Sequence, residues 1–184
     1  MTVSMSFELD SDNPSSSSYD NKSMTVSSDE LGTLVFAGHG GSSAVSAIDA
    51  TAAGDIFDNF DGQIGTAETA LAAGDAAMLT SPGGANTMLY TLPSMVDGLS
   101  VSASYTPQGA TIGASSSSAY GLTYTGVEGL SVSYGAGSND AANGTTLDAD
   151  VTTMKASYAY GSVTVAYSDH EFDSATATRD QDTT

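Results

Sequence analysis

The sequence contains no cysteine and no tryptophan in its 184 residues. Without cysteine, the chain has no disulfide framework, no thiolate metal site and no cysteine nucleophile. Its apolar residues never run together for the roughly 18 positions that a transmembrane helix needs. The opening stretch Met1–Asp10 also lacks the basic start and the long apolar core of a signal peptide. Because maturation removes such a peptide from an exported protein, its absence leaves the cellular location open.

Basic residues are scarce. Three Lys and Arg stand against 22 Asp and Glu, which gives a formal net charge of −19 and a pI near 4.1. A chain this acidic is poorly suited to binding a nucleic-acid backbone or to docking on anionic lipid by polybasic attraction. Charged residues make up only 14% of the chain, well below the roughly 25% of ordinary soluble domains. Together with abundant Ser, Thr, Gly and Ala, this composition is unlike that of an ordinary cytosolic enzyme.

Apolar and polar residues alternate with a period of two along most of the chain. In the first run, Val3, Met5, Phe7 and Leu9 are separated by Ser, Ser and Glu residues. Such alternation predicts strands with one apolar face and one polar face, and here the polar face is almost entirely Ser and Thr. The pattern recurs often enough to predict about nine strands, over residues 2–9, 22–28, 32–38, 86–92, 98–105, 118–125, 130–136, 151–160 and 162–169.

Short turns join the predicted strands at one end, and long polar connections join them at the other. The short turns, in which Gly supplies the positive φ of a tight hairpin, span residues 28–32, 95–98, 126–129 and 160–161. The connection after Gly38 is by far the longest and extends to about Ala85. This arrangement predicts an antiparallel up-and-down meander. Two bare edges on such a sheet would promote aggregation, so we expect the chain to be part of a larger barrel.

The alternation alone fits two folds. In a soluble β-sandwich the apolar face packs inward, whereas in an outer-membrane barrel it meets lipid and the Ser/Thr face lines a wet lumen. Three features favour the barrel: strands near the length of a tilted bilayer-spanning strand, loops of unlike length at the two ends, and tyrosines at predicted strand ends, where interfacial girdles lie. These tyrosines are Tyr90, Tyr105, Tyr124, Tyr134, Tyr158, Tyr160 and Tyr167.

Several segments resemble the Gram-negative general diffusion porins, in particular the trimeric porins of alphaproteobacterial type. Segment 29–38, with the sequence Asp-Glu-Leu-Gly-Thr-Leu-Val-Phe-Ala-Gly, is similar to the hairpin before that family's pore-constricting loop. Segments 118–124 (Ser-Ala-Tyr-Gly-Leu-Thr-Tyr), 129–134 and 153–161 continue the resemblance in the same order and with similar spacing. Outside the loops, the resemblance covers most of the chain.

The resemblance implies an all-β transmembrane barrel with antiparallel up-and-down strands, about 16 of them in the full protein. If two strands precede Met1, residues 1–184 form a single partial porin barrel domain that covers approximately strands three to eleven. Residues 39–84 then correspond to the third extracellular loop, which folds into the pore and constricts it.

The implied function is passive diffusion of small hydrophilic solutes and ions through the bacterial outer membrane. The implied assembly is a homotrimer in contact with outer-membrane lipid and lipopolysaccharide. No enzyme activity is expected, because the chain lacks a Gly-x-Ser-x-Gly nucleophile elbow and a phosphate-binding loop with its Lys.

The predicted constriction loop carries six acidic residues and no Lys or Arg. On the porin interpretation, their carboxylates create a negative field at the narrowest point, which predicts a preference for cations unless basic residues line the opposite wall. The other interpretation of the same charges is a solvated acidic surface loop. The six residues are Asp49, Asp55, Asp58, Asp61, Glu68 and Asp75.

Alternation also predicts residues that face the lumen from the wall. We expect Glu8, Ser102, Ser133 and Lys155 there, with Lys22 as a further basic candidate. These are few bases to set against the acidic loop.

Part of the same loop has the spacing of a calcium-binding loop. Its EF-hand register puts Phe57 at the first ligand position, and no helix leads into it, so a true EF-hand is not expected. Asp58, Asp61 and Glu68 remain weak candidates for a loosely held structural Ca²⁺, and no other metal or cofactor is expected. The alternative function is therefore a secreted or cell-surface β-sheet protein, structural or adhesive, with acidic Ca²⁺-binding loops.

Overall fold

A computed structural model describes residues 1–9, 19–38, 41–45, 86–107, 116–140, 148–174 and 181–183 of the chain. Structural statements below concern these residues. Within them, no helix has the length and apolar character that crossing a membrane would require.

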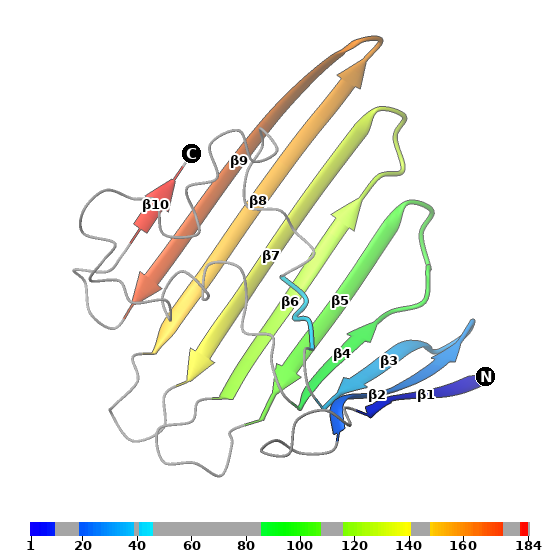
Figure 1. The fold of residues 1–184 in the computed structure, drawn as a ribbon. Coiled ribbons are helices and arrows are strands. Elements are labelled where there is room, and N and C mark those ends of the chain that lie inside the picture. Colours follow the sequence, from blue (N-terminus) through cyan, green and yellow to red (C-terminus); the bar gives the residue numbers. More distant parts are fainter. Residues whose placement is uncertain are drawn as a thin grey trace.

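Ten strands form one antiparallel sheet in chain order, with each strand paired to the next (Figure 1). The nine predicted strands are all present. Their bounds are β1 Thr2–Leu9, β2 Tyr19–Ser28, β3 Gly32–Ala37, β4 Thr87–Thr91, β5 Leu99–Thr106, β6 Ser116–Tyr124, β7 Leu130–Asp140, β8 Ala149–Tyr160 and β9 Val163–Ser174. A short tenth strand, β10 Gln181–Thr183, pairs with β9 beyond the last of the predicted strands. The up-and-down meander is therefore confirmed.

Strands β7 and β9 are longer than the alternation indicated. Each continues past the apolar part of its outer face into a stretch whose outward positions are polar, with Ser138 in β7 and Glu171 in β9. These stretches still pair with their neighbours, as in the pairs Asn139–Ala149 and Asp173–Asp150. Apolar alternation marks only the part of a strand that has an apolar face, so the polar extension gave no sequence signal.

The cross-strand register separates the two faces as predicted. Residues directly opposite each other in antiparallel strands share a face. Met5 is opposite Met24, Val26 is opposite Leu34, and the series continues through the outer residues of the later strands. The other face carries mainly Ser, Thr, Ala and Gly.

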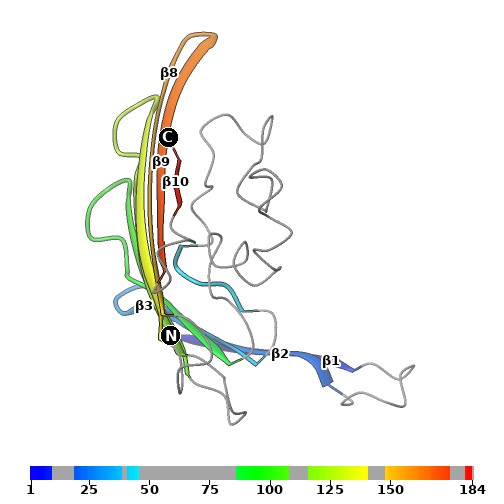
Figure 2. The same ribbon diagram turned by 90° about the vertical axis from the view of Figure 1, so that its left-hand side faces the viewer.

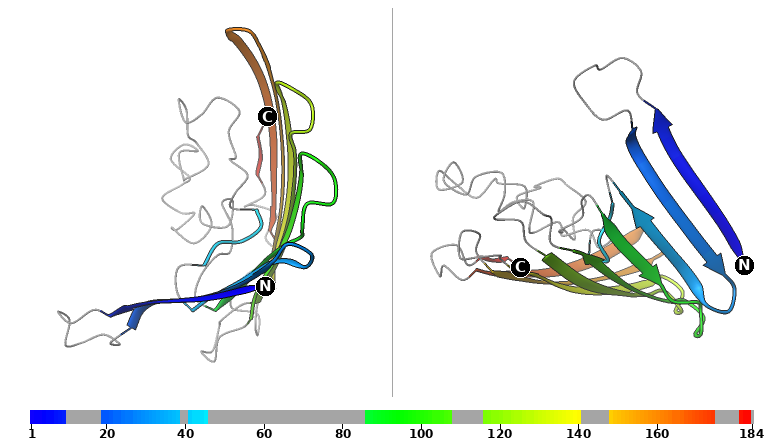
Figure 3. Two further views of the ribbon diagram at one scale, coloured as in Figure 1. Left: turned by 90° about the vertical axis from the view of Figure 1, so that its right-hand side faces the viewer. Right: turned by 90° about the horizontal axis from the view of Figure 1, so that it is seen from below.

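The sheet is strongly curved. Figures 2 and 3 show that β5 to β9 bow around one side and that β1 and β2 turn steeply out of their line. The segment Gly41–Val45 lies on the concave side (Figure 2). Its contacts with Ser104 and with the backbone at Gly121 identify the Ser/Thr face as the concave one.

Two of the short turns have the same sequence pattern and geometry. Val96-Asp97-Gly98-Leu99 and Val127-Glu128-Gly129-Leu130 each close with a hydrogen bond from the Leu N–H to the Val carbonyl, at 3.1 Å and 3.0 Å. The Gly in each has a positive φ, 75° and 77°. Only Gly takes that conformation without strain at the third position of a type II turn.

The turn glycines differ in how much space surrounds them, which gives a matched pair of substitutions. A Cβ on Gly129 would lie 2.4 Å from the Ala159 carbonyl oxygen, whereas a Cβ on Gly161 would meet nothing within 4 Å. Both residues have a positive φ. We expect Gly161→Ala to lower the free energy of unfolding by about 1–2 kcal/mol through backbone strain alone. Gly129→Ala should lower it by roughly a further 1–3 kcal/mol because of the clash. Urea unfolding of protein refolded in vesicles measures both, and equal losses would contradict the clash.

Candidate functional site

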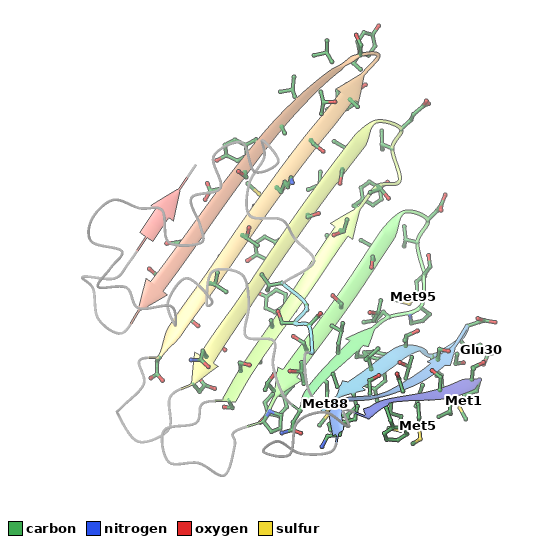
Figure 4. All side chains as sticks on the ribbon, viewed as in Figure 1. Met1, Met5, Glu30, Met88 and Met95 are labelled. Carbon is green, nitrogen blue, oxygen red and sulfur yellow. The ribbon has the colours of Figure 1, made fainter. Side chains whose placement is uncertain are left out.

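The convex face is apolar and uncovered in the structure. Large apolar side chains on it are exposed on strands from β1 to β9, for example Phe7 at 60% and Val165 at 67%. Met5 and Met88, labelled in Figure 4, belong to the same face. The buried apolar residues, by contrast, are few and small: Ala37, Ala44, Val45, Ala119 and Val151. An apolar surface this extended requires an apolar partner such as lipid or another protein.

Tyrosines on the convex face follow a sloping line near the long-loop end. From Tyr105 on β5 the line passes through Tyr120 on β6 and Tyr134 on β7 to Tyr167 on β9. Tyr105 is opposite Ser118, two residues from Tyr120, and Tyr120 is opposite Ala136, two residues from Tyr134. Tyr134 is opposite Met154, and Met154 is opposite Asp169, which is two residues from Tyr167. The line therefore shifts by six residues over four strand steps, always toward the short turns.

A second line of tyrosines runs parallel to the first, nearer the short turns. It passes from Tyr90 on β4 through Tyr124 on β6 to Tyr158 on β8. Across β5, Tyr90 is in register with Tyr120, and Tyr120 is four residues from Tyr124. Across β7, Tyr124 is in register with Ala156, and Ala156 is two residues from Tyr158. This line also shifts by six residues over four strand steps, the sum of four and two.

The common slope has a simple geometric meaning. A shift of 1.5 residues per strand, six divided by four, is about 5 Å along a strand for each ~4.8 Å between strands. Strands that cross a flat boundary with that stagger are tilted by about 45°, close to the tilt of transmembrane barrel strands. The two lines are only four residues apart along β6, from Tyr120 to Tyr124, which is about 13 Å of strand. They therefore lie too close together to mark the two surfaces of a bilayer, since the apolar belt of such barrels is about 25 Å tall.

Polar residues begin on the convex face just beyond the first line. Ser118, Ser138, Thr152 and Glu171 occupy outward positions on the long-loop side of it. At the boundary, the Tyr167 hydroxyl donates a 2.9 Å hydrogen bond to an Asp169 carboxylate oxygen. Tyr134 and Tyr167 were predicted at strand ends; they lie within longer strands, at the end of the apolar band.

The concave face is lined by hydroxyl groups. Two pairs of hydroxyl groups on neighbouring strands of this face form hydrogen bonds: Thr87 with Thr106 at 2.8 Å, and Thr123 with Ser133 at 3.1 Å. Neighbouring hydroxyl groups that satisfy one another leave a polar surface that water can wet.

The register places three of the four predicted wall residues, Ser102, Ser133 and Lys155, on this concave face. Ser133 is directly opposite Lys155, and Ser102 is opposite Gly121. Glu8 lies in β1 at the position opposite Asn21. Lys22 is opposite Phe7, on the apolar face, so the expectation that it faces inward is wrong. Alternation with Met24 and Val26 on the same strand already gives that answer.

The first part of the long connection is seated on the concave face. The Ala44 N–H donates a 2.9 Å hydrogen bond to Ser104 Oγ on β5. Ala44 and Val45 pack with Ala119 of β6, and the partly buried Leu89 of β4 contacts the same cluster. The segment that follows β3 therefore turns onto the hydroxyl-lined side of the sheet instead of away from it.

The predicted constriction acids lie outside the described residues, and so do the weak calcium candidates. They are Asp49, Asp55, Asp58, Asp61, Glu68 and Asp75. Across the ranges that the structure describes, no group of three or more His, Cys, Asp or Glu is placed to hold a metal ion.

Sequence reasoning missed the residues that seat the loop. Gly121 and Ser104 looked like ordinary members of the alternating strands. On the convex face, Tyr120 was likewise missing from the predicted set of interfacial tyrosines. The available signal was Gly121 itself, because a Gly inside a strand often marks a close approach of another backbone segment.

Comparison with known proteins gives one family. A model of the Gram-negative porin family matches residues 1–184. The searches of curated proteins and of solved structures found no match. The family match supports the barrel over the sandwich, and it agrees with the outer-membrane hypothesis and not with the alternative of a secreted surface protein.

Proposed function

The chain belongs to the Gram-negative porin family, and from that membership we propose that it acts as a passive channel for small hydrophilic solutes and ions in the bacterial outer membrane. The family describes a channel rather than an enzyme. In this proposal the convex apolar face meets lipid, and the concave hydroxyl-lined face borders the aqueous pore.

One observation carries the proposal beyond the family name. The chain leaves β3, crosses onto the concave face and is held there by Ser104 and the β6 wall. A loop that runs inside the barrel narrows the pore and makes passage depend on solute size. Ser102, Ser133 and Lys155 would then line the route as wall residues.

Selectivity is the second part of the proposal. We propose that residues 39–84 form the constriction and that their acids favour cations. The loop carries Asp49, Asp55, Asp58, Asp61, Glu68 and Asp75 without a base, and Lys155 is the only Lys or Arg that the described register places on the concave face. Loosely bound Ca²⁺ at Asp58, Asp61 and Glu68 stays a weaker hypothesis within the same loop.

The extent of the barrel follows from the family resemblance. We propose that residues 1–184 form one partial barrel domain, approximately strands three to eleven of a 16-stranded wall. In the described sheet β1 and β10 each pair with a single neighbour, which leaves both with an edge free for a further strand.

The channel activity is tested directly in planar lipid bilayers. We expect the purified full-length protein to insert from detergent and to produce stepwise increases in KCl current. In liposomes, it should admit small sugars faster than larger ones, because passage is sieved by size. Protein that refolds into vesicles yet leaves them impermeable to ions would contradict the proposal.

Assembly is a further prediction. We propose a homotrimer whose outer walls also contact lipid and lipopolysaccharide, as the resemblance to trimeric porins implies. The exposed convex face offers apolar surface for such contacts. Native mass spectrometry after gentle detergent extraction should give three times the mass of one chain. Bound glycolipid should add discrete mass increments. A purely monomeric mass under the same conditions would contradict the trimer.

A further inference from the structure

The contact between Gly41–Val45 and the wall is closely packed. Ala44 and Val45 expose only 3% and 1% of their surface, and the wall residue Ala119 exposes 5%. In a closely packed protein interior, one group cannot shift without moving its neighbours. The position of this segment is therefore fixed by the wall residues beneath it.

Both backbone polar groups of Ala44 face the wall. The N–H donates to Ser104 Oγ, a group that is itself buried. The carbonyl oxygen lies over Gly121, where a Cβ would come within 2.4 Å of it. Ordinary contact starts near 3.4 Å, so a side chain at position 121 would push the carbonyl away from the wall by about 1.0 Å, the difference between the two distances.

Gly121 has no other evident reason to be glycine. It lies inside β6, directly opposite Gly135, and it is not among the residues with a positive φ. A Gly within a strand weakens that strand relative to Ala, because Gly loses more backbone freedom on folding. The nearest obstacle to a side chain is the Ala44 backbone, and the next side chain, Ser102 Oγ, is at an ordinary 3.4 Å.

We propose that Gly121 and Ser104 are positioning residues that hold the start of the constriction loop against the wall and so set the free cross-section of the pore. Gly121 sets the distance of the loop backbone from the wall, and Ser104 keeps it at that distance. The contact of Gly41–Val45 with Ser104, Ala119 and Gly121 is called the seat of the loop. The inference about pore width rests on the proposed channel function, whereas the existence of the seat does not.

Single-channel conductance tests the role of Gly121. We expect conductance to fall stepwise from wild type to Gly121→Ala to Gly121→Val, because each larger side chain moves Ala44 further into the pore. Ala166→Val is the matched control: it also enlarges a small residue on the concave face, but on β9, opposite Ser157. Its conductance should equal that of wild type. A Gly121→Val channel with wild-type conductance would overturn the proposal.

Ser104→Ala removes the partner of the Ala44 N–H without adding bulk. We expect increased open-channel current noise with a mean conductance closer to wild type than that of Gly121→Val. A rise in noise that Ala166→Val shows equally would contradict the specific role of Ser104.

A cross-link tests the seat independently of channel activity. The chain has no cysteine, so the double variant Val45→Cys with Ala119→Cys contains a single possible pair. These residues pack in one cluster, and we expect the pair to form a disulfide under mild oxidant in refolded vesicles. Val45→Cys with Tyr120→Cys is the control, since Tyr120 is on the convex face and should not react.

The two measurements separate the possible failures. A cross-link without any conductance would reject the channel and keep the seat. Conductance without a cross-link would reject the seat and keep the channel. Cross-linking together with the stepwise fall in conductance supports the whole proposal.

Discussion

Val132→Arg should destabilise the folded protein in a bilayer by about 2–4 kcal/mol, whereas Ser131→Arg, one residue away, should cost little. Val132 lies on the convex face between Leu130 and Tyr134, within the apolar band. A guanidinium at that position loses its hydration to lipid without gaining a partner. Ser131 faces the other way, opposite Ser157, where an added charge remains in water.

The measurement is the free energy of unfolding in vesicles, taken from reversible denaturant titration of each variant. Comparing neighbours on one strand keeps strand propensity and sequence context nearly constant. Equal losses at the two positions would show that the convex face does not meet lipid, as would a larger loss at Ser131.

The strands and their two faces were predictable from the sequence because one periodicity encodes both. A strand that separates two solvents must alternate, so runs such as Leu99 to Tyr105 identify their element and its orientation together. The turns were predictable for a related reason. Gly98 and Gly129 are required by their positive φ, and that requirement is local in the sequence.

The loop seat was not predictable because it depends on contacts distant in the chain. Ser104 and Ala44 are 60 residues apart, and no local pattern relates a serine on β5 to an alanine after β3. The slope of the tyrosine lines was hidden for a similar reason. It appears only when the register between strands is known, since each tyrosine alone looks like any aromatic residue at a strand end.

In the proposed channel, the wall supplies a polar surface with little charge, and the loop supplies the charges that set ion selectivity. The wall is nearly neutral: hydroxyls such as Thr123 and Ser133 pair with each other, and Lys155 is its one described basic residue. Glu30, Asp97 and Glu128 lie in short turns, and six more acidic residues belong to the proposed constriction loop. Selectivity in this arrangement depends on which charged segment lies nearest the ion path, and the seated loop is the strongest candidate.

We therefore expect the wild-type channel to prefer K⁺ over Cl⁻ and the triple variant Asp55→Asn, Asp58→Asn, Asp61→Asn to lose most of that preference. Carboxylates in a narrow, weakly polarisable constriction concentrate cations and repel anions. Their influence extends over about one Debye length, roughly 10 Å at 0.1 M salt. The measurement is the reversal potential under a tenfold KCl gradient, for which ideal selectivity to one monovalent ion gives about 59 mV.

A second triple variant isolates position from total charge. Glu30→Gln, Asp97→Asn and Glu128→Gln remove three exposed carboxylates from the short turns, and Figure 4 shows Glu30 at one of them. Both triple variants change the formal charge from −19 to −16. If the loop acids set selectivity, only the first variant moves the reversal potential toward zero, and the difference between the variants grows as salt is lowered. Equal shifts would assign the preference to net charge, and anion preference in the wild type would assign it to residues outside the loop.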